Sequence, residues 1–370
     1  MIRLADLSGG RDNNLNLIRF LAAVAVLVSH ATPIAIGAGV AEPLVAVTGH
    51  SLGTIALFIF FAISGFLITA SFQRSSSHIS FILARTLRLM PGLIASLLLV
   101  AFLMGPFVTT QPVSSYFADW NVYAFVLRNT ALFPLQYRLP GVFDGQPVEA
   151  VVGSIWTLKH EVLCYVGVFI AGLAGAWKSN ARAAGALALY AGVWAVGAMF
   201  ADVVSYHAAK LLTLSMPFAI GVAFWIWRDR IVLHPVIFAA LAAIAWAMAG
   251  TPLALPLFAL ALSYATFWLA YVPGGAVRRF NRLGDYSYGI YVYAFPLQGL
   301  VVYLFGPQTP LQNMGLAFVP TLLVSILSWH LVEQPAMARK AAILRLLGYG
   351  PRAPRLTDPE GLNVDPARRL

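Results

Sequence analysis

The chain has 370 residues, of which 60% are hydrophobic and only 10% are charged, and its mean hydropathy is +0.79. This composition excludes a soluble globular protein and indicates a polytopic membrane protein. A net charge of +10 would suggest a nucleic-acid partner in a soluble chain. The positive residues instead follow the membrane topology, so we expect membrane lipids around the chain and no nucleic acid.

A membrane-spanning helix needs about 20 mainly apolar residues. We therefore predict an all-α bundle of about ten transmembrane helices. The segments that meet this requirement are 15–36, 53–73, 82–104, 156–176, 183–201, 207–227, 231–249, 253–272, 284–305 and 312–334. The first segment contains Arg19 and precedes many others, so we interpret it as a retained helix rather than a cleaved signal peptide.

The loops divide the chain and orient it in the membrane. Short cytoplasmic loops are enriched in Lys and Arg, and with a cytoplasmic N-terminus 20 of the 24 positive residues fall on that side. We therefore predict that both termini are cytoplasmic. Residues 1–337 form one integral-membrane domain, 338–370 a basic cytoplasmic tail, and 105–155, rich in Pro, Tyr, Asn and Gln, a folded extracytoplasmic loop.

Metal and cofactor motifs are missing from the sequence. The one cysteine, Cys164, lies inside an apolar run, which excludes an internal disulfide and a cysteine-based metal site. No Walker loop, no dinucleotide-binding glycine pattern and no metal-like spacing of His, Asp and Glu occurs. We expect neither a metal nor a permanently bound cofactor.

The first predicted span carries two ionisable residues, Arg19 and His30. Eleven positions apart on a helix, they point within about 20° of each other and are separated by about 16 Å along the axis. Arg19 is a permanent cation suited to phosphate or carboxylate, whereas His30 can exchange a proton near neutral pH. The alternative is that Arg19 reaches the lipid headgroups and His30 bonds a backbone carbonyl in a packed core.

Two further arginines, Arg85 and Arg88, lie three residues apart at the cytoplasmic entry of the third predicted span, just before Pro91. They share one helix face and could together hold a polyanion such as a nucleotide phosphate. Contact with lipid headgroups is the alternative, but it does not account for Arg19 joining them from another helix.

Glu161 lies about five residues inside the outer boundary of the fourth predicted span, at nearly the depth expected for His30. A carboxylate beside an imidazole would orient the ring and raise its basicity, as in a general base with a supporting acid. The alternative is that Glu161 pairs with Lys159 or His160 at the membrane interface.

Other polar residues favour structural interpretations. Ser64 and Gly65 are typical of close helix packing, because no G-x-S-x-G elbow surrounds the serine. Asp285 and Ser287 are plausible helix caps. Glu333, three residues after His330, is typical of a solvated helix end.

An ordered set of motifs resembles the bacterial acyltransferase 3 family of membrane-embedded O-acyltransferases. The set contains Arg-x10-His (Arg19, His30), "FFAISGFLI", Arg-x-x-Arg-x-x-Pro (Arg85, Arg88, Pro91), "WTLKHEVLCYV", "GDYSYGIYVYAFP" and "VEQP". It runs from about residue 12 to 337. By motif, His30 and Glu161 match catalytic positions of the family, and Arg19, Arg85 and Arg88 match positions that bind acyl-CoA.

The resemblance implies transfer of an acyl group, most often acetyl, from cytoplasmic acyl-CoA as co-substrate to a hydroxyl of a surface or exported glycan, including exopolysaccharides and lipid-linked acceptors. It places the protein in the bacterial inner membrane. Our hypothesis is direct transfer, with His30 as general base and Glu161 steadying it. A polytopic transporter or glycan-lipid flippase is the alternative, although the halves show no clear internal repeat. The oligomeric state and the acceptor stay open.

Overall fold

The computed structural model describes residues 2–10, 12–37, 39–40, 42–200 and 202–349, so the predicted basic tail lies outside the described residues from residue 350 onward. Within these residues the chain is helical, and its only β-contacts are two isolated bridges, Arg3 with Val232 and Thr109 with Val142. The all-α prediction is confirmed.

Nine helical segments of the described chain are long and apolar enough to cross a membrane, which confirms a polytopic membrane protein. Six of them contain the helices α2 (Leu15–Ile36), α4 (Leu52–Arg74), α9 (Trp156–Leu173), α10 (Asn180–Met199), α11 (Tyr206–Ile226) and α13 (Ala254–Tyr271). The other three contain α5 (His78–Leu98) with its π-helical extension η1 (Leu99–Met104), α14 (Ser287–Phe305) and α15 (Pro310–Ser328).

The segment predicted as a span at 231–249 is the exception. Its helix, α12 (Pro235–Ala247), has 13 residues and therefore a length of about 20 Å, short of a hydrocarbon core of about 30 Å. Pro235 starts the helix after the His234 cap, and a turn at Met248–Ala249 ends it. The composition correctly identified this segment as apolar. It did not predict that a proline and a turn would limit the length of its helix.

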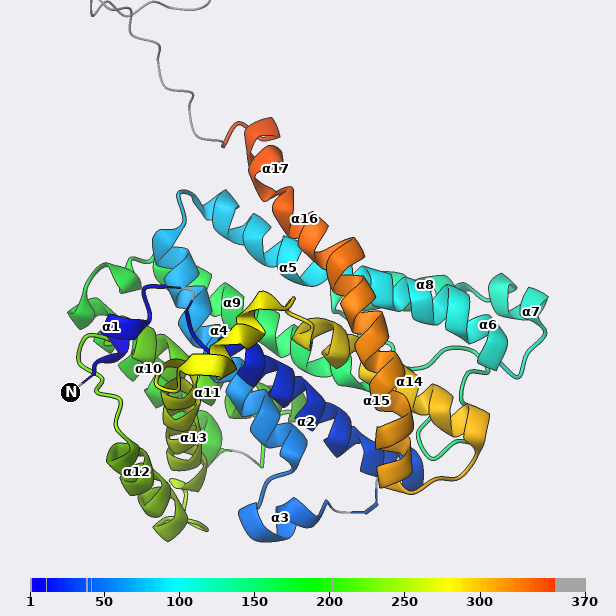
Figure 1. Ribbon diagram of the computed structural model, residues 1–370, viewed down its shortest axis with the longest axis horizontal. Helices are drawn as coiled ribbons and strands as arrows, with labels where there is room; N and C mark the ends of the chain where they lie inside the picture. Colours follow the sequence, from blue (N-terminus) through cyan, green and yellow to red (C-terminus); the bar gives the residue numbers. More distant parts are fainter. Residues whose placement is uncertain (1, 11, 38, 41, 201, 350–370) are drawn as a thin grey trace, which may run out of the picture.

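Helix α2 lies inside the bundle, in contact with α4, α14 and α15 (Figure 1). Its first turn is fixed by Asn14, whose Nδ2 donates to the carbonyl oxygens of Leu269 at 3.0 Å and Pro273 at 2.8 Å. Because these carbonyls lie at the end of α13 and just after it, the start of α2 is tied to a helix far along the chain. The face carrying Arg19 and His30 is thereby turned towards protein.

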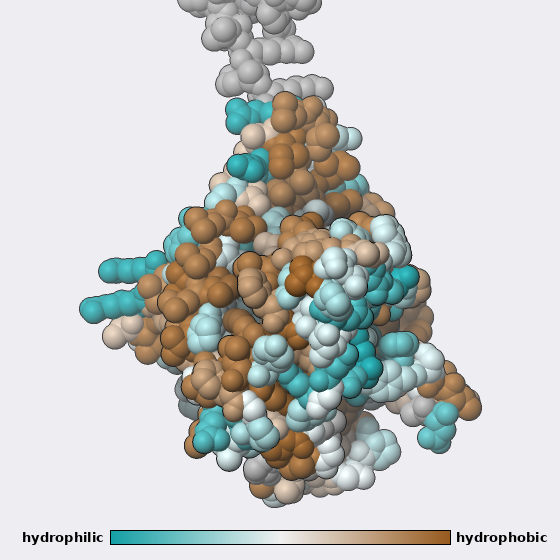
Figure 2. Space-filling view, turned by 90° about the vertical axis from the view of Figure 1, so that its right-hand side faces the viewer, coloured by the Kyte–Doolittle hydropathy of each residue, from teal (hydrophilic) through white to brown (hydrophobic). Residues whose placement is uncertain are grey.

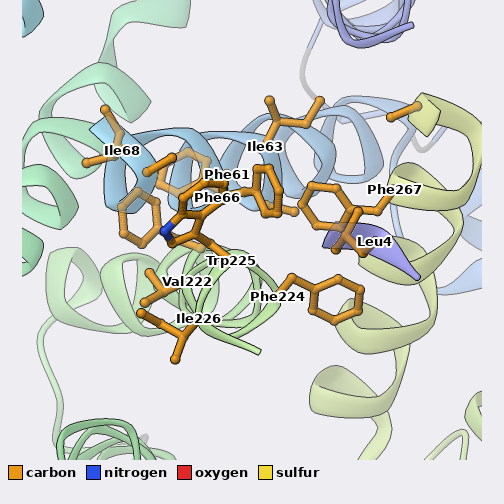
Figure 3. Packing of buried hydrophobic residues seen from close by; sticks show 14 of the residues in the cluster. Leu4, Phe61, Ile63, Phe66, Ile68, Val222, Phe224, Trp225, Ile226 and Phe267 are labelled. Atoms are coloured by element: carbon orange, nitrogen blue, oxygen red, sulfur yellow. The ribbon is translucent and has the colours of Figure 1, made fainter. Parts of the chain in front are cut away.

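The main apolar core lies where α4, α11 and α13 meet (Figure 3). Phe66 of α4 packs against Trp225 of α11 and Phe267 of α13, with ring centroids 5.2 Å and 4.8 Å away. The helices approach closely because Gly65 has no side chain: a Cβ atom there would lie 2.0 Å from the carbonyl oxygen of Phe218. The packing role predicted for Gly65 is confirmed.

The outer surface is largely apolar. Helix α10 buries almost none of its side chains, leaving Leu189, Val193 and Met199 exposed. The face drawn in Figure 2 divides into a broad hydrophobic area and a more hydrophilic band. Apolar surface of this extent is typical of a protein surrounded by lipid.

The segment 105–155 is folded, as its composition predicts, and contains α6 (Gly105–Val108), α7 (Val113–Ala118) and α8 (Trp120–Ala131). The buried side chain of Asn129 fastens it by donating to the Gln136 carbonyl and accepting from the Gln136 amide, at 2.8 and 2.9 Å. Its predicted extracytoplasmic location stays a prediction.

We expect Gly65→Ala to destabilise the bundle, because the new methyl group would force the α4 and α11 backbones apart. Overpacking of this kind costs about 1–3 kcal/mol or more, so the midpoint of thermal denaturation in detergent should fall. Gly167→Ala is the matched control, since nothing lies within 4 Å of a Cβ atom at that position of α9. Equal midpoints for the two variants would contradict the close contact.

Candidate functional site

Four of the predicted site residues line one cavity in the bundle, which we call the arginine cavity. Arg19 enters it from α2, Arg85 and Arg88 from α5, and Glu161 from α9. Its other polar lining comes from Ser64, Thr157, Tyr165, Ser287, Tyr288 and Tyr291, and its apolar lining from Leu57, Phe60, Phe61, Ile63, Leu67, Ile68, Leu89 and Leu158. The convergence of Arg19 with the two arginines of the third predicted span is therefore present.

Asp285, just before α14, connects two of the arginines. Its Oδ2 lies 2.5 Å from Nη1 of Arg19 and 2.6 Å from Nη2 of Arg88, while its Oδ1 accepts from Ser287 Oγ at 2.5 Å. Burial raises the pKa of the Asp285 carboxyl, but Arg19 and Arg88 lower it more, and the pKa falls to about 2. The sequence interpretation of Asp285 as a simple helix cap missed these ion pairs.

Glu333 is the second carboxylate on Arg88, in the π-helical turn η5 (Trp329–Glu333) after α15. Its Oε2 lies 3.1 Å from Nη1 of Arg88, its Oε1 accepts from Ser328 Oγ at 3.0 Å, and it is 1% exposed. The interpretation of Glu333 as a solvated helix end was wrong. The π-helical turn and the ion pair with a distant helix bring it inside, and neither follows from local spacing.

Arg88 is also enclosed by aromatic rings. Its guanidinium carbon lies 5.6 Å from the ring centroid of Tyr288 and 5.7 Å from that of Trp329. Gly92, one turn further along α5, lets Tyr288 approach, because a Cβ atom there would lie 2.8 Å from that ring. With two carboxylates and two rings around it, Arg88 is held as part of the framework.

Arg85 differs from its two neighbours. No hydrogen bond or ion pair within the described residues uses its guanidinium, and its Nε is buried without a hydrogen-bond partner. It interacts electrostatically with Glu161 and Tyr165. Of the three arginines lining the cavity, Arg85 is thus the one that no carboxylate of the described chain pairs with.

Glu161 bonds to different partners from those expected. Its Oε1 accepts from Ser64 Oγ of α4 and from the Tyr165 hydroxyl, each at 2.5 Å. The two alternative partners are engaged elsewhere: Lys159 Nζ lies 4.8 Å from the Phe133 ring centroid, and His160 Nδ1 lies 2.9 Å from the Trp156 carbonyl oxygen. The carboxylate of Glu161 therefore faces the arginine cavity, where it is hydrogen-bonded to Ser64.

His30 lines a second, neighbouring cavity, which we call the histidine cavity. Ser29, Glu42, Ser51 and Thr54 supply polar lining. Glu42 accepts from Ser29 Oγ and, at 3.0 Å, from the Leu52 amide, so it fastens the connection between α3 (Pro43–Thr48) and α4 over the end of α2. The His30 ring meets Phe295 edge-on at 5.2 Å, and its Nδ1 is buried without a hydrogen-bond partner in the described chain.

Three side chains, Leu57, Thr157 and Tyr291, line both cavities and form the wall between them. The Tyr291 hydroxyl donates to the Ser154 carbonyl and is hydrogen-bonded to Thr157 Oγ1. The matched depths inferred from the sequence suggested a direct contact between His30 and Glu161. The structure places them on opposite sides of this wall, because Glu161 turns towards α4 and the arginines.

Comparison with known proteins defines the class. The family model described as an acyltransferase domain matches residues 12–330. Since the match covers most of the chain and five of the six motifs contribute side chains to the two adjoining cavities, the protein belongs to the acyltransferase 3 family and is a multi-pass membrane acyltransferase. The resemblance predicted from the motifs is confirmed.

Individual relatives agree with the family. The chain is 30% identical to the O-acetyl transferase of Shigella phage Sf6, over 91% of this chain and 99% of the relative. It is 28% identical to nodulation protein 10 of Rhizobium leguminosarum bv. viciae, over 91% and 96%. No solved structure matches the chain.

We expect Asp285→Asn to weaken the bundle, because it leaves Arg19 without its carboxylate and Arg88 with only Glu333. Removing one partner of a buried ion pair costs about 3 kcal/mol or more, which should lower the denaturation midpoint at pH 7. Because the Asp285 pKa is lower in the folded state, its contribution is complete above about pH 4 and is lost as the pH falls towards 2. The difference between wild type and variant should narrow over that range.

Asp12→Asn is the control for this prediction. Asp12 also pairs with an arginine, Arg278, but its side chain is 74% exposed, and exposed pairs contribute little. A midpoint at pH 7 that is no lower for Asp285→Asn than for Asp12→Asn would contradict the role assigned to Asp285.

Proposed function

We propose that the protein is an O-acetyltransferase that moves an acetyl group from cytoplasmic acyl-CoA to a hydroxyl of a surface or exported glycan. Membership of the acyltransferase 3 family and the likeness to an O-acetyl transferase support O-acetyl transfer. We further propose the bacterial inner membrane as its location, with both termini in the cytoplasm, as the distribution of Lys and Arg indicates. Acyl-CoA enters as a co-substrate and leaves as CoA.

The observation that carries the proposal is the pair of adjoining cavities, one with three arginines and a glutamate and the other with a histidine. Acyl-CoA is anionic at its phosphates and reactive at its thioester, so its binding site needs a cation and a nearby proton-transfer group. Arg85 offers unpaired guanidinium donors for the anion. Arg19 and Arg88 keep their carboxylate partners and hold the shape of the cavity around Arg85.

In this proposal His30 is the general base for the acceptor hydroxyl. An imidazole can remove the hydroxyl proton as the new ester bond forms. Its Nδ1 has no hydrogen-bond partner in the described chain, and the polar side chains of the histidine cavity offer contacts to a sugar. The glycan, whether lipid-linked or a finished polymer, therefore approaches through the histidine cavity.

The test is acetyl transfer by the purified full-length protein in lipid nanodiscs, supplied with labelled acetyl-CoA and candidate glycans. Mass spectrometry of the glycans detects the O-acetylated product, and comparing surface glycans of cells with and without the protein identifies the acceptor. A transporter would leave every glycan unmodified.

We expect His30→Ala to reduce glycan acetylation by about 10²- to 10⁴-fold, the usual range for loss of a general base, while the variant still inserts and binds acetyl-CoA. His207→Ala, which removes an exposed imidazole at the start of α11, should acetylate at the wild-type rate. Near-normal turnover by His30→Ala would rule out the base role.

We expect Arg85→Ala to raise the KM for acetyl-CoA by about 10- to 100-fold, since a hydrogen bond to a charged group contributes about 1.5–3 kcal/mol. The KM for the glycan should change little. Arg345→Ala, at an exposed position of α17 (Lys340–Leu346), is the matched control. Unchanged donor KM in Arg85→Ala would count against the anion role.

A further inference from the structure

Ser64 is the one hydroxyl of α4 that points into the arginine cavity. Its neighbour Gly65 is pressed against the α11 backbone, and successive helix residues differ by about 100° in direction, so Ser64 is turned towards α9. There its Oγ donates to Glu161 Oε1 at 2.5 Å and lies 3.2 Å from the Tyr165 hydroxyl. A close-packing residue would need none of these contacts.

The arrangement has the parts of an activated nucleophile. A hydroxyl is a weak nucleophile until an adjacent base accepts its proton, and Glu161 is such a base within hydrogen-bond distance. Tyr165 donates to the same Glu161 oxygen at 2.5 Å and so fixes the carboxylate. Arg85 adds a guanidinium without an ion-pair partner to the same cavity and interacts with both Glu161 and Tyr165.

The wall between the cavities separates Ser64 from His30. Arg85 and Glu161 lie on one side of it, and His30 lies on the other. Leu57, part of the wall, and Ser64 belong to the same helix, seven residues and therefore about 10 Å apart along its axis. An acetyl ester on Ser64 lies on the arginine side of the wall, so a glycan hydroxyl that gives its proton to His30 has to reach the ester past the side chains of the wall.

Resting on the acetyl transfer proposed above, we propose that Ser64 is a catalytic nucleophile that carries the acetyl group as an ester between the two half-reactions. Transfer is then a two-step exchange through an acyl-enzyme rather than the direct transfer expected from the sequence. Glu161 acts as the base for Ser64, and His30 as the base for the glycan.

In the first half-reaction Ser64 Oγ attacks the thioester carbonyl carbon. The Oγ–C bond forms, the C–S bond breaks, and its electron pair leaves with the sulfur of CoA as thiolate. The proton of Ser64 moves to Glu161, which becomes neutral. Free CoA is released before any glycan is needed.

In the second half-reaction a glycan hydroxyl attacks the ester carbonyl and gives its proton to His30. The bond between the carbonyl carbon and Ser64 Oγ breaks, and Oγ takes back the proton held by Glu161. The glycan ester leaves, the imidazolium of His30 loses its proton to solvent, and the CoA thiolate is protonated in the cytoplasm. Every group of the protein is then in its starting state.

Isotope exchange without a glycan tests the proposal directly. The full-length protein in nanodiscs is incubated with acetyl-CoA and isotope-labelled free CoA, and labelled acetyl-CoA is followed by mass spectrometry. Reversal of the first half-reaction predicts label in acetyl-CoA and an acetyl group on the peptide containing Ser64 after acid quenching. His30→Ala should keep this exchange while losing glycan acetylation, since His30 acts only in the second half-reaction.

Ser64→Ala should lose both the exchange and glycan acetylation by at least about 100-fold. The matched control is Ser71→Ala, which removes a hydroxyl from the same helix two turns away, outside the lining of the arginine cavity. If Ser64→Ala fails to fold, the position of the acetyl group on wild-type peptides decides the question. An acetyl group on Tyr165 in place of Ser64 would overturn the assignment.

Failure of this inference is distinguishable from failure of the proposed function. Wild-type protein that acetylates a glycan but exchanges no label, or Ser64→Ala that acetylates at the wild-type rate, overturns the acyl-enzyme and leaves acetyl transfer standing. Wild-type protein that exchanges label through Ser64 supports the inference whichever glycan is supplied. Protein that neither exchanges label nor acetylates any glycan contradicts both.

Discussion

The carboxylate of Asp285 connects guanidinium groups from two different helices, Arg19 of α2 and Arg88 of α5. An unpaired charge inside a membrane protein is costly, whereas a paired and hydrogen-bonded one can be tolerated. Together with Glu333 on Arg88, this carboxylate joins four separated parts of the chain around one point, namely α2, α5, the residue pair before α14, and η5. Three arginines line the cavity, and Asp285, Glu333 and Glu161 supply three carboxylates that balance their charge.

The ion pairs give the three arginines different roles. Arg19 and Arg88 form ion pairs with carboxylates of the protein, so they shape the cavity. Arg85 keeps its donors available. The division explains how the bundle brings three like charges together without their mutual repulsion forcing the helices apart, while the guanidinium of Arg85 has no carboxylate partner in the described chain.

The sequence predicted the long spans well, because a run of about 20 apolar residues rarely forms anything other than a membrane-spanning helix. It also predicted that Arg19 joins Arg85 and Arg88, from residue types that are costly in a membrane, but it placed Glu161 beside His30 instead of beside the arginines. It did not predict α12, whose length is set by a proline and a turn. Counting residues predicts how far along its helix a side chain such as Glu161 lies. It does not predict which neighbouring helix that side chain faces.

The sequence also did not reveal which side chains form ion pairs with one another. Asp285 and Glu333 are close to Arg88 only through tertiary structure, across about 200 and 245 positions of sequence. Ser64 was interpreted as a packing residue because small residues in a membrane span usually permit close helix contact, and because no G-x-S-x-G elbow surrounds it. One signal in the sequence could have distinguished the roles of Ser64 and Gly65. Because the glycine alone is sufficient for a close helix contact, the polar side chain next to it in an apolar span is free to face a cavity.

The wall formed by Leu57, Thr157 and Tyr291 also bears on the membrane as a barrier. Two polar cavities that merged within a bilayer would form a continuous path for water, and protons could cross along it. A leucine, and two hydroxyl groups already bonded to each other, interrupt that path. The three side chains that divide the two cavities therefore also interrupt the polar lining that would otherwise run from one cavity into the other.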